Sequence, residues 1–68
     1  MPELTRREVE VLRWVARGKS AWEIAAILHI TKRTVDEYVA TAMRKLGAAN
    51  RTHAAVIAIR DRIIDLPD

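Results

Sequence analysis

The sequence predicts an all-α domain of four short helices, and its hydrophobic pattern is the main reason. Apolar residues recur with a period of about 3.6 residues along almost the whole chain, and no segment alternates like a strand. Residues that favour helix N-termini precede the periodic segments, and glycines follow two of them. The expected helices span about residues 6–17, 21–28, 32–46 and 51–64.

The first two expected helices each begin with a capping box, in which a hydroxyl residue is followed three positions later by glutamate. Residues 5–8 are Thr-Arg-Arg-Glu and residues 20–23 are Ser-Ala-Trp-Glu. In such a box the hydroxyl accepts from the N–H three residues on, and the carboxylate accepts from the N–H of the capping residue. Gly18 stands where a left-handed residue is needed after the first helix, so it is expected to end that helix.

The third and fourth expected helices have simpler boundaries. Thr31 is expected to cap the third helix and Gly47 to end it, while Asn50 caps the fourth. Residues 28–30 form the turn before the third helix, and His29 in this turn tolerates a positive φ better than a bulky β-branched residue. The expected inward stripe of the third helix is Val35, Val39, Ala42, Met43 and Leu46.

Size and composition exclude several kinds of protein. The 68 residues form one expected domain, 1–68, and they include no cysteine and two histidines, so no cofactor or metal is expected. The chain shows no catalytic constellation and leaves little room for a deep pocket, so we expect a protein that is not an enzyme. No signal peptide or bilayer-length apolar run is visible, which predicts a cytoplasmic protein without a membrane partner.

Residues 20–46 combine a short helix, a tight turn and a longer helix with a polar outer face. This pattern is typical of a helix-turn-helix, whose second helix enters the major groove of double-stranded DNA. The net charge of +3 and the arginine-rich set of basic residues favour a polyanionic partner. An ordinary helical bundle that serves as a protein-interaction module has the same helix pattern, and it remains the alternative.

Many residues in register resemble the DNA-binding domain of LuxR-type regulators, also called GerE-like. The resemblance covers residue 4 to about residue 64, and residues 18–24 together with residues 42–46 are most similar to the quorum-sensing branch. The matching residues are Leu4, Thr5, Arg7, Glu8, Val11, Leu12, Gly18, Lys19, Ser20, Glu23, Ile24, Ala25, Leu28, Ile30, Thr31, Thr34, Val35, Lys45, Leu46, Gly47, Asn50 and Arg51.

The resemblance implies a sequence-specific transcription regulator of which this domain is the C-terminal part. In the quorum-sensing branch, an N-terminal domain that binds an acyl-homoserine lactone precedes the DNA-binding domain. An effector-binding domain and RNA polymerase are therefore expected partners. The alternative within the wider family is the output domain of a response regulator that depends on phosphorylation.

The resemblance also implies that base edges are read from the positions of Asp36, Glu37 and Ala40, with Arg33 nearby. Asp36 and Glu37 depart from the basic or polar residues that are common at these positions. A carboxylate repels phosphate, yet it can accept a hydrogen bond from cytosine N4. Two alternatives stay open: the acidic residues read bases, or they are solvated and only disfavour non-specific binding.

Phosphate contacts are expected near helix N-termini and along the third helix. Lys45 matches a family lysine that contacts the DNA backbone, while hydroxyl and N–H groups at helix N-termini can also meet phosphate. For Ser20 and Thr31 the alternative is capping alone, and one hydroxyl can do both. The candidate phosphate contacts are Lys19, Ser20, Thr31, Lys32, Thr34, Arg44 and Lys45.

Other positions have a structural or a less specific expected role. Glu8, Leu12 and Gly18 match family positions that hold the scaffold together. Trp22, in the first turn of the second helix, is expected to contact a DNA strand or a partner domain, or else to be a half-buried core aromatic residue. Tyr38 is expected to pack with its hydroxyl toward solvent or phosphate.

The fourth expected helix is apolar on more than one side. Ala54, Ala55 and Ala58 can pack inward. The remaining apolar residues are then expected to pair with a second copy of the chain, or to contact a preceding domain. These candidate dimer residues are Val56, Ile59 and Ile63.

Overall fold

The computed structural model describes residues 3–66, and these form four helices without a strand. The helices are α1 (Arg6–Ala16), α2 (Ala21–Leu28), α3 (Lys32–Leu46) and α4 (Arg51–Arg60). The all-α prediction is confirmed, and the first three helices begin and end within one residue of their predicted bounds.

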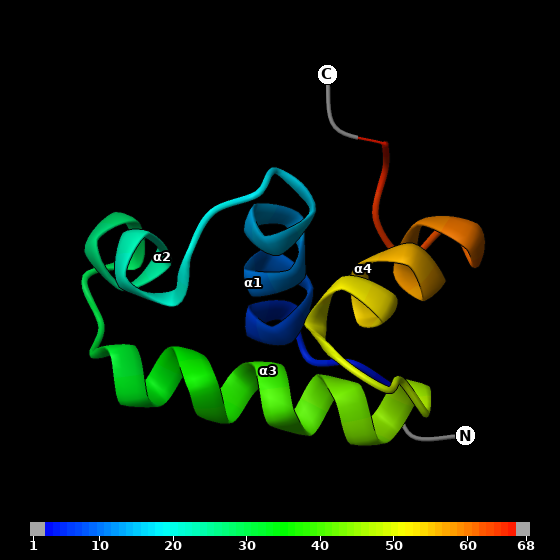
Figure 1. The fold of residues 1–68 in the computed structure, drawn as a ribbon, viewed down its shortest axis with the longest axis horizontal. Coiled ribbons are helices and arrows are strands. Elements are labelled where there is room, and N and C mark those ends of the chain that lie inside the picture. The colour runs from blue at the N-terminus through cyan, green and yellow to red at the C-terminus, as the bar shows by residue number, and fades with distance from the viewer. Residues whose placement is uncertain (1–2, 67–68) are drawn as a thin grey trace.

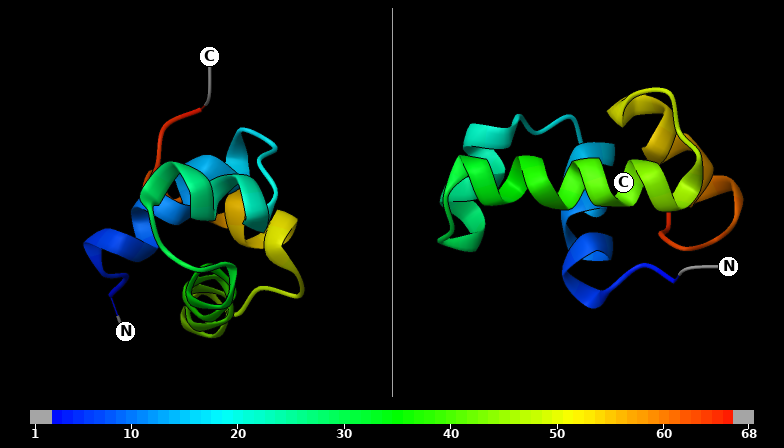
Figure 2. Two further views of the ribbon diagram at one scale, coloured as in Figure 1. Left: turned by 90° about the vertical axis from the view of Figure 1, so that its left-hand side faces the viewer. Right: turned by 90° about the horizontal axis from the view of Figure 1, so that it is seen from below.

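The three shorter helices all lie on one side of α3. In Figure 1, α3 runs along the lower edge, and α2, α1 and α4 lie above it from left to right. Contacts join α3 to each of these helices, and α1 also packs on α4. Seen from below in Figure 2, α3 crosses in front of its neighbours. One long side of α3 is therefore left uncovered.

The predicted capping residues begin the helices as expected. The backbone N–H of Glu8 donates to Thr5 Oγ1 at 3.2 Å, and Thr5 N–H donates to Glu8 Oε1 at 2.8 Å. Ser20 and Glu23 form the same reciprocal pair with the same distances. Asn50 Oδ1 accepts from the backbone N–H of His53 at 2.8 Å. Both predicted capping boxes and the Asn50 cap are confirmed.

Left-handed residues set the turns between these helices. Gly18 has a φ of +81° and Gly47 a φ of +66°, so each can take a conformation that a side chain disfavours. His29, the residue after α2, has a φ of +57°, which confirms the prediction for this turn. The tight turn brings the N-terminus of α3 close to α2.

The core consists of two apolar clusters, and α1 contributes to both of them. The first cluster lies among α1, α2 and α3 and also includes Ala55 of α4. The second includes Leu12 of α1, Ala42 of α3 and Ala58 of α4. Leu12 has no exposed surface. Because α3 and α4 also contribute to both clusters, these three helices together join the α2 side of the domain to the α4 side.

The prediction that the fourth helix extends to about residue 64 is wrong, since α4 ends at Arg60. Arg62 has a φ of +59°, and the N–H of Ile63 donates to the carbonyl of Ala58 at 2.8 Å. This reversal directs Ile64 back into the second cluster, where only 3% of its surface is exposed. Burial of Ile64 outweighs the continuation of the helix.

None of the helices in the described part of the chain combines the length and the apolar character that a bilayer crossing requires.

Candidate nucleic-acid interface

The uncovered side of α3 gathers the residues that were predicted to read bases. Arg33, Glu37 and Ala40 are exposed, and Asp36 lies beside them. Val35 and Val39, on the opposite side of the same helix, are buried in the first cluster. The helical period separates the two sets, so core packing directs the polar residues of α3 outward.

Both acidic residues on this surface are paired with a cation from the preceding helical turn. Lys32 Nζ lies 2.7 Å from Asp36 Oδ2, and Arg33 Nε lies 4.0 Å from Glu37 Oε2. Neither pair was predicted from the sequence, although their spacing of four residues was a usable signal. The uncovered side of α3 is consequently a surface of paired charges rather than an acidic patch.

The hydroxyl groups proposed for phosphate contact also cap their helices. Ser20 Oγ accepts from the N–H of Glu23 at 3.2 Å, and Thr31 Oγ1 accepts from the N–H of Thr34 at 3.1 Å. Thr31 Oγ1 also donates to Thr34 Oγ1 at 2.9 Å. Ser20 and Thr31 are exposed, so capping leaves their outer surfaces open to a ligand.

Lys45, another candidate phosphate contact, forms a partly buried ion pair within the domain. Its Nζ lies 2.8 Å from Glu8 Oε1, and the side chains are 22% and 5% exposed. Burial favours a raised pKa for Glu8, but the ammonium of Lys45 and the hydrogen bonds from Thr5 together hold the pKa below its usual value. The pair joins α3 to α1 across 37 residues of sequence.

The remaining cationic candidates differ in their surroundings. Arg44 is exposed on α3, and its guanidinium donates to Thr41 Oγ1 at 3.2 Å. Lys19 is half-buried in the turn between α1 and α2, where its backbone N–H donates to the carbonyl of Trp14 at 3.1 Å. Lys19 therefore lies outside the uncovered side of α3.

Trp22 is exposed rather than half-buried in the core, which removes one of its three predicted alternatives. Its exposed fraction is 71%, and Lys32 Nζ lies 5.7 Å from the centre of its ring. This cation–π contact connects the first turns of α2 and α3. Tyr38, in contrast, is half-buried and packs against the first cluster.

The candidate dimer residues are only partly free of the core. Val56 is 55% exposed, whereas Ile59 and Ile63 are half-buried against the second cluster. Ile57, which was not singled out from the sequence, is buried. The expectation that all of the candidate residues are surplus to the core is therefore wrong for Ile59 and Ile63. Ile59 packs inward from within α4, and Ile63 packs inward from the turn that follows it.

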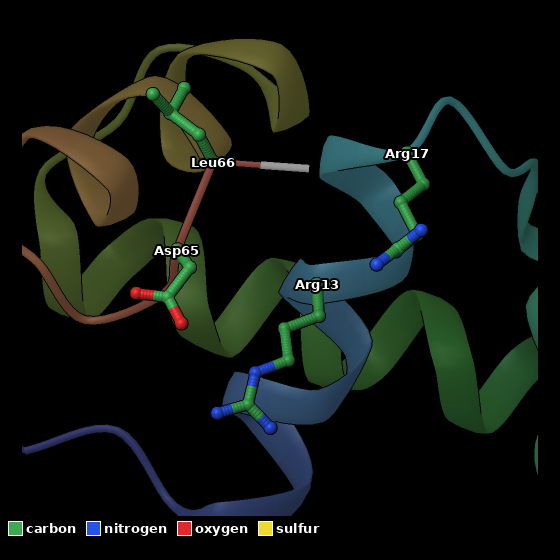
Figure 3. Close-up of a pocket in the computed structure, with 4 residues that line it drawn as sticks. All are labelled: Arg13, Arg17, Asp65 and Leu66. Atoms are coloured by element: carbon green, nitrogen blue, oxygen red, sulfur yellow. The ribbon is translucent and has the colours of Figure 1, made fainter. Parts of the chain in front are cut away.

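A small pocket lies on a different part of the surface. Arg13 of α1 and Arg17, directly after α1, line one side of it, and Asp65 and Leu66, after α4, line the other (Figure 3). Its volume is about 160 Å³. Both arginines are exposed, and none of the residues that line this pocket belongs to α3. Among residues 3–66, no group of histidine or acidic residues could hold a metal.

The arrangement defines a helix-turn-helix protein of the DNA-binding kind: α2 and α3 meet at a tight turn, and the longer second helix presents one uncovered polar side. The chain belongs to the luxR family of bacterial regulatory proteins, because the sequence model of this family matches residues 2–58. It is a LuxR-type DNA-binding domain of a transcription regulator and not an enzyme, as predicted.

Similar proteins support the more specific resemblance. The chain is 64% identical over 62 residues to the transcriptional activator protein BjaR1 of Bradyrhizobium diazoefficiens, covering 91% of this chain and 26% of BjaR1. It is 54% identical over 63 residues to RpaR of Rhodopseudomonas palustris, a quorum sensing-dependent transcriptional regulator, covering 93% of this chain and 26% of RpaR. The predicted similarity to the quorum-sensing branch is confirmed. The chain spans about a quarter of the length of these relatives.

Solved structures have the same fold. The structure of the transcription factor GerE superposes with a TM-score of 0.89 at 30% identity and covers 94% of this chain and 96% of that one. The response regulator ChrA of a heme-sensing two-component system gives a TM-score of 0.89 at 36% identity, covering 94% of this chain and 32% of ChrA. The shared fold is therefore found in more than one class of regulator.

Proposed function

We propose that α3 enters the major groove of operator DNA while the N-terminal ends of α2 and α3 hold the phosphate backbone. The uncovered polar side of α3 is the observation that supports this function best. It presents Arg33, Glu37 and Ala40 without any covering element. An α-helix exposed in this way fits the width of the major groove.

The proposed phosphate contacts surround that helix. Ser20, Thr31 and Thr34 stand at helix N-termini, where N–H groups and hydroxyls favour an anion. Lys19, Lys32 and Arg44 add positive charge. Lys45 contributes as well, because an ammonium has three N–H donors and one bond to Glu8 leaves the others for a phosphate oxygen.

Two aromatic residues complete the proposed contact surface. Trp22 is well exposed next to Lys32, so its ring can lie along a sugar–phosphate strand or against a partner domain. The hydroxyl of Tyr38 is the second candidate for such a contact, since the ring itself packs on the core.

Removal of the Arg44 charge tests the DNA contact directly. In Arg44→Ala, we expect weaker binding to duplex DNA and a plot of log affinity against log salt whose slope is smaller by about 1, because one fewer phosphate is neutralised. Arg13→Ala is the matched control, since it removes the same charge from an exposed position on α1 that is not part of the uncovered side of α3. Equal binding by Arg44→Ala and the wild type would contradict the proposed interface, as would a wild type that binds no duplex.

A homodimer through α4 is part of the proposed function. Val56 is the most exposed of its three candidate residues, and Ile59 and Ile63 are only partly covered. A groove of about 730 Å³ nearby is lined by Leu46 and Ile63, among others. A two-fold dimer through this region places two recognition helices on a symmetric operator.

A charge introduced at this surface tests the dimer. We expect Val56→Glu to shift sedimentation velocity profiles toward the monomer and to weaken binding to a two-half-site operator, because a carboxylate is costly to bury in an apolar interface. Ile27→Glu changes another exposed apolar side chain, on α2, and should not alter the association state. Identical profiles for the wild type and Val56→Glu would remove α4 from the proposal.

The larger protein is proposed to be a cytoplasmic quorum-sensing regulator, with an N-terminal effector-binding domain and RNA polymerase as partners. The identity to RpaR over 63 residues supports this proposal. The similarity to ChrA supports the alternative of an output domain in a response regulator that depends on phosphorylation.

A further inference from the structure

We infer that Asp36 and Glu37 make α3 selective for G·C base pairs and weaken its attraction to other DNA. The inference rests on the proposed insertion of α3 into the major groove, and it concerns which duplexes that helix accepts. Both carboxylates are paired with the cation four residues earlier, at 2.7 Å for Lys32 and 4.0 Å for Arg33. These two ion pairs lie next to each other in the first half of α3.

The pairs change the net charge that α3 presents to a phosphate backbone. Lys32, Arg33 and Arg44 would give the outward side of α3 a charge of +3, and the two carboxylates reduce it to +1. Non-specific affinity for DNA comes almost entirely from neutralised phosphates. The carboxylates therefore lower the affinity of the helix for a duplex that offers nothing except its backbone.

The pairs are easily opened by a ligand that offers better partners. The side chains of Arg33 and Glu37 are 89% and 67% exposed, and those of Lys32 and Asp36 are 38% and 47% exposed. Exposed ion pairs within a helix are weak because water and salt screen them. Their separation on a suitable DNA surface therefore costs little.

A G·C pair offers such partners to both members of an ion pair. In the major groove guanine presents the acceptors N7 and O6, and cytosine presents the donor N4. A cation can donate to guanine while the carboxylate accepts from cytosine. Residues four apart in a helix are separated by about 6 Å along its axis, so one ion pair spans one or two base pairs.

An A·T pair fits the same ion pair less well. Its donor, adenine N6, lies beside the acceptor N7 of the same base, and thymine presents only the acceptor O4 and a methyl group. A carboxylate there meets an acceptor together with the donor. The alternation of charge on α3 thus favours G·C over A·T.

The double variant D36N/E37Q tests both parts of the inference in the 68-residue chain. It removes two charges and preserves the size of each side chain. At 50 mM salt, we expect the double variant to bind a random-sequence duplex about tenfold more tightly than the wild type does. The salt slope of the double variant should be steeper by about 2. The control variant E10Q/D65N removes two carboxylates that line pockets together with Arg13 and are not part of α3, and it should leave both quantities close to those of the wild type.

Selection of bound duplexes from a random pool tests base preference. The wild type is expected to enrich G·C pairs in the core of each half-site, and D36N/E37Q is expected to lose the cytosine requirement there. Selection of the same sites by both proteins, or equal binding of both to random DNA, would overturn the inference while leaving the proposed function intact. A wild type that binds no duplex under any condition would overturn both.

Discussion

Replacement of Lys45 by methionine is expected to destabilise the domain by about 3 kcal/mol, because it leaves the carboxylate of Glu8 buried without its cation. Domains have about 0.05–0.15 kcal/mol of stability per residue, so this loss would be a large part of the total for 68 residues. Urea denaturation followed by circular dichroism measures the change.

A surface ion pair of the same length is the control. Arg7 Nη1 and Glu10 Oε1 are also 2.8 Å apart, but their side chains are 40% and 42% exposed. Arg7→Met should therefore cost about 0.5 kcal/mol or less. Equal costs for Lys45→Met and Arg7→Met would show that burial does not set the strength of the Glu8–Lys45 pair.

The pH dependence of stability in the wild type and in Lys45→Met gives an independent check. The folded state lowers the pKa of Glu8 from its usual 4.5, so the pair adds stability above that pH and the stability is lost as pH falls through the folded pKa. The difference between the wild type and Lys45→Met should consequently narrow below about pH 4.5. A difference that stays constant from pH 7 to pH 3 would contradict an electrostatic origin.

Truncation of Leu12 to alanine is expected to destabilise the domain by roughly 3–5 kcal/mol, enough to unfold much of the population. Leu12 is fully buried, and its cluster includes Ala42, Ala54 and Ala58, whose short side chains cannot move to fill a cavity. The shift of the urea midpoint at constant slope measures the cost.

Leu66→Ala removes the same atoms from a leucine that is 74% exposed. We expect its effect to stay within about 0.5 kcal/mol, since little apolar surface returns to water. A cost for Leu12→Ala as small as that for Leu66→Ala would refute the two-cluster description of the core.

Features that depend on neighbouring residues were predictable from the sequence. Thr5 and Glu8 are three positions apart, so their reciprocal hydrogen bonds form whenever a helix begins there. Gly18 and Gly47 stop helices for an equally local reason. The outward direction of Arg33 and Glu37 followed from the helical period once the inward stripe of α3 was identified.

Features that depend on distant residues were not predictable in the same way. The contact between Glu8 and Lys45 joins residues 37 positions apart, and the resemblance pointed to phosphate for Lys45. Trp22 had three alternatives because its exposure depends on how α2 packs against α3. The end of α4 was misplaced because the helical pattern continues past Arg60, while burial of Ile64 bends the chain back.

The sequence by itself determined the number of helices, the bounds of the first three, their caps, the helix-turn-helix and its family, since each of these depends on residues close together in the chain or on a pattern of matching positions. Only the tertiary structure decided that Lys45 is tied to Glu8, that Ile59 and Ile63 lie partly in the core, and that Trp22 is exposed. Burial and long-range ion pairs arise when helices pack together, and a local pattern does not contain that information.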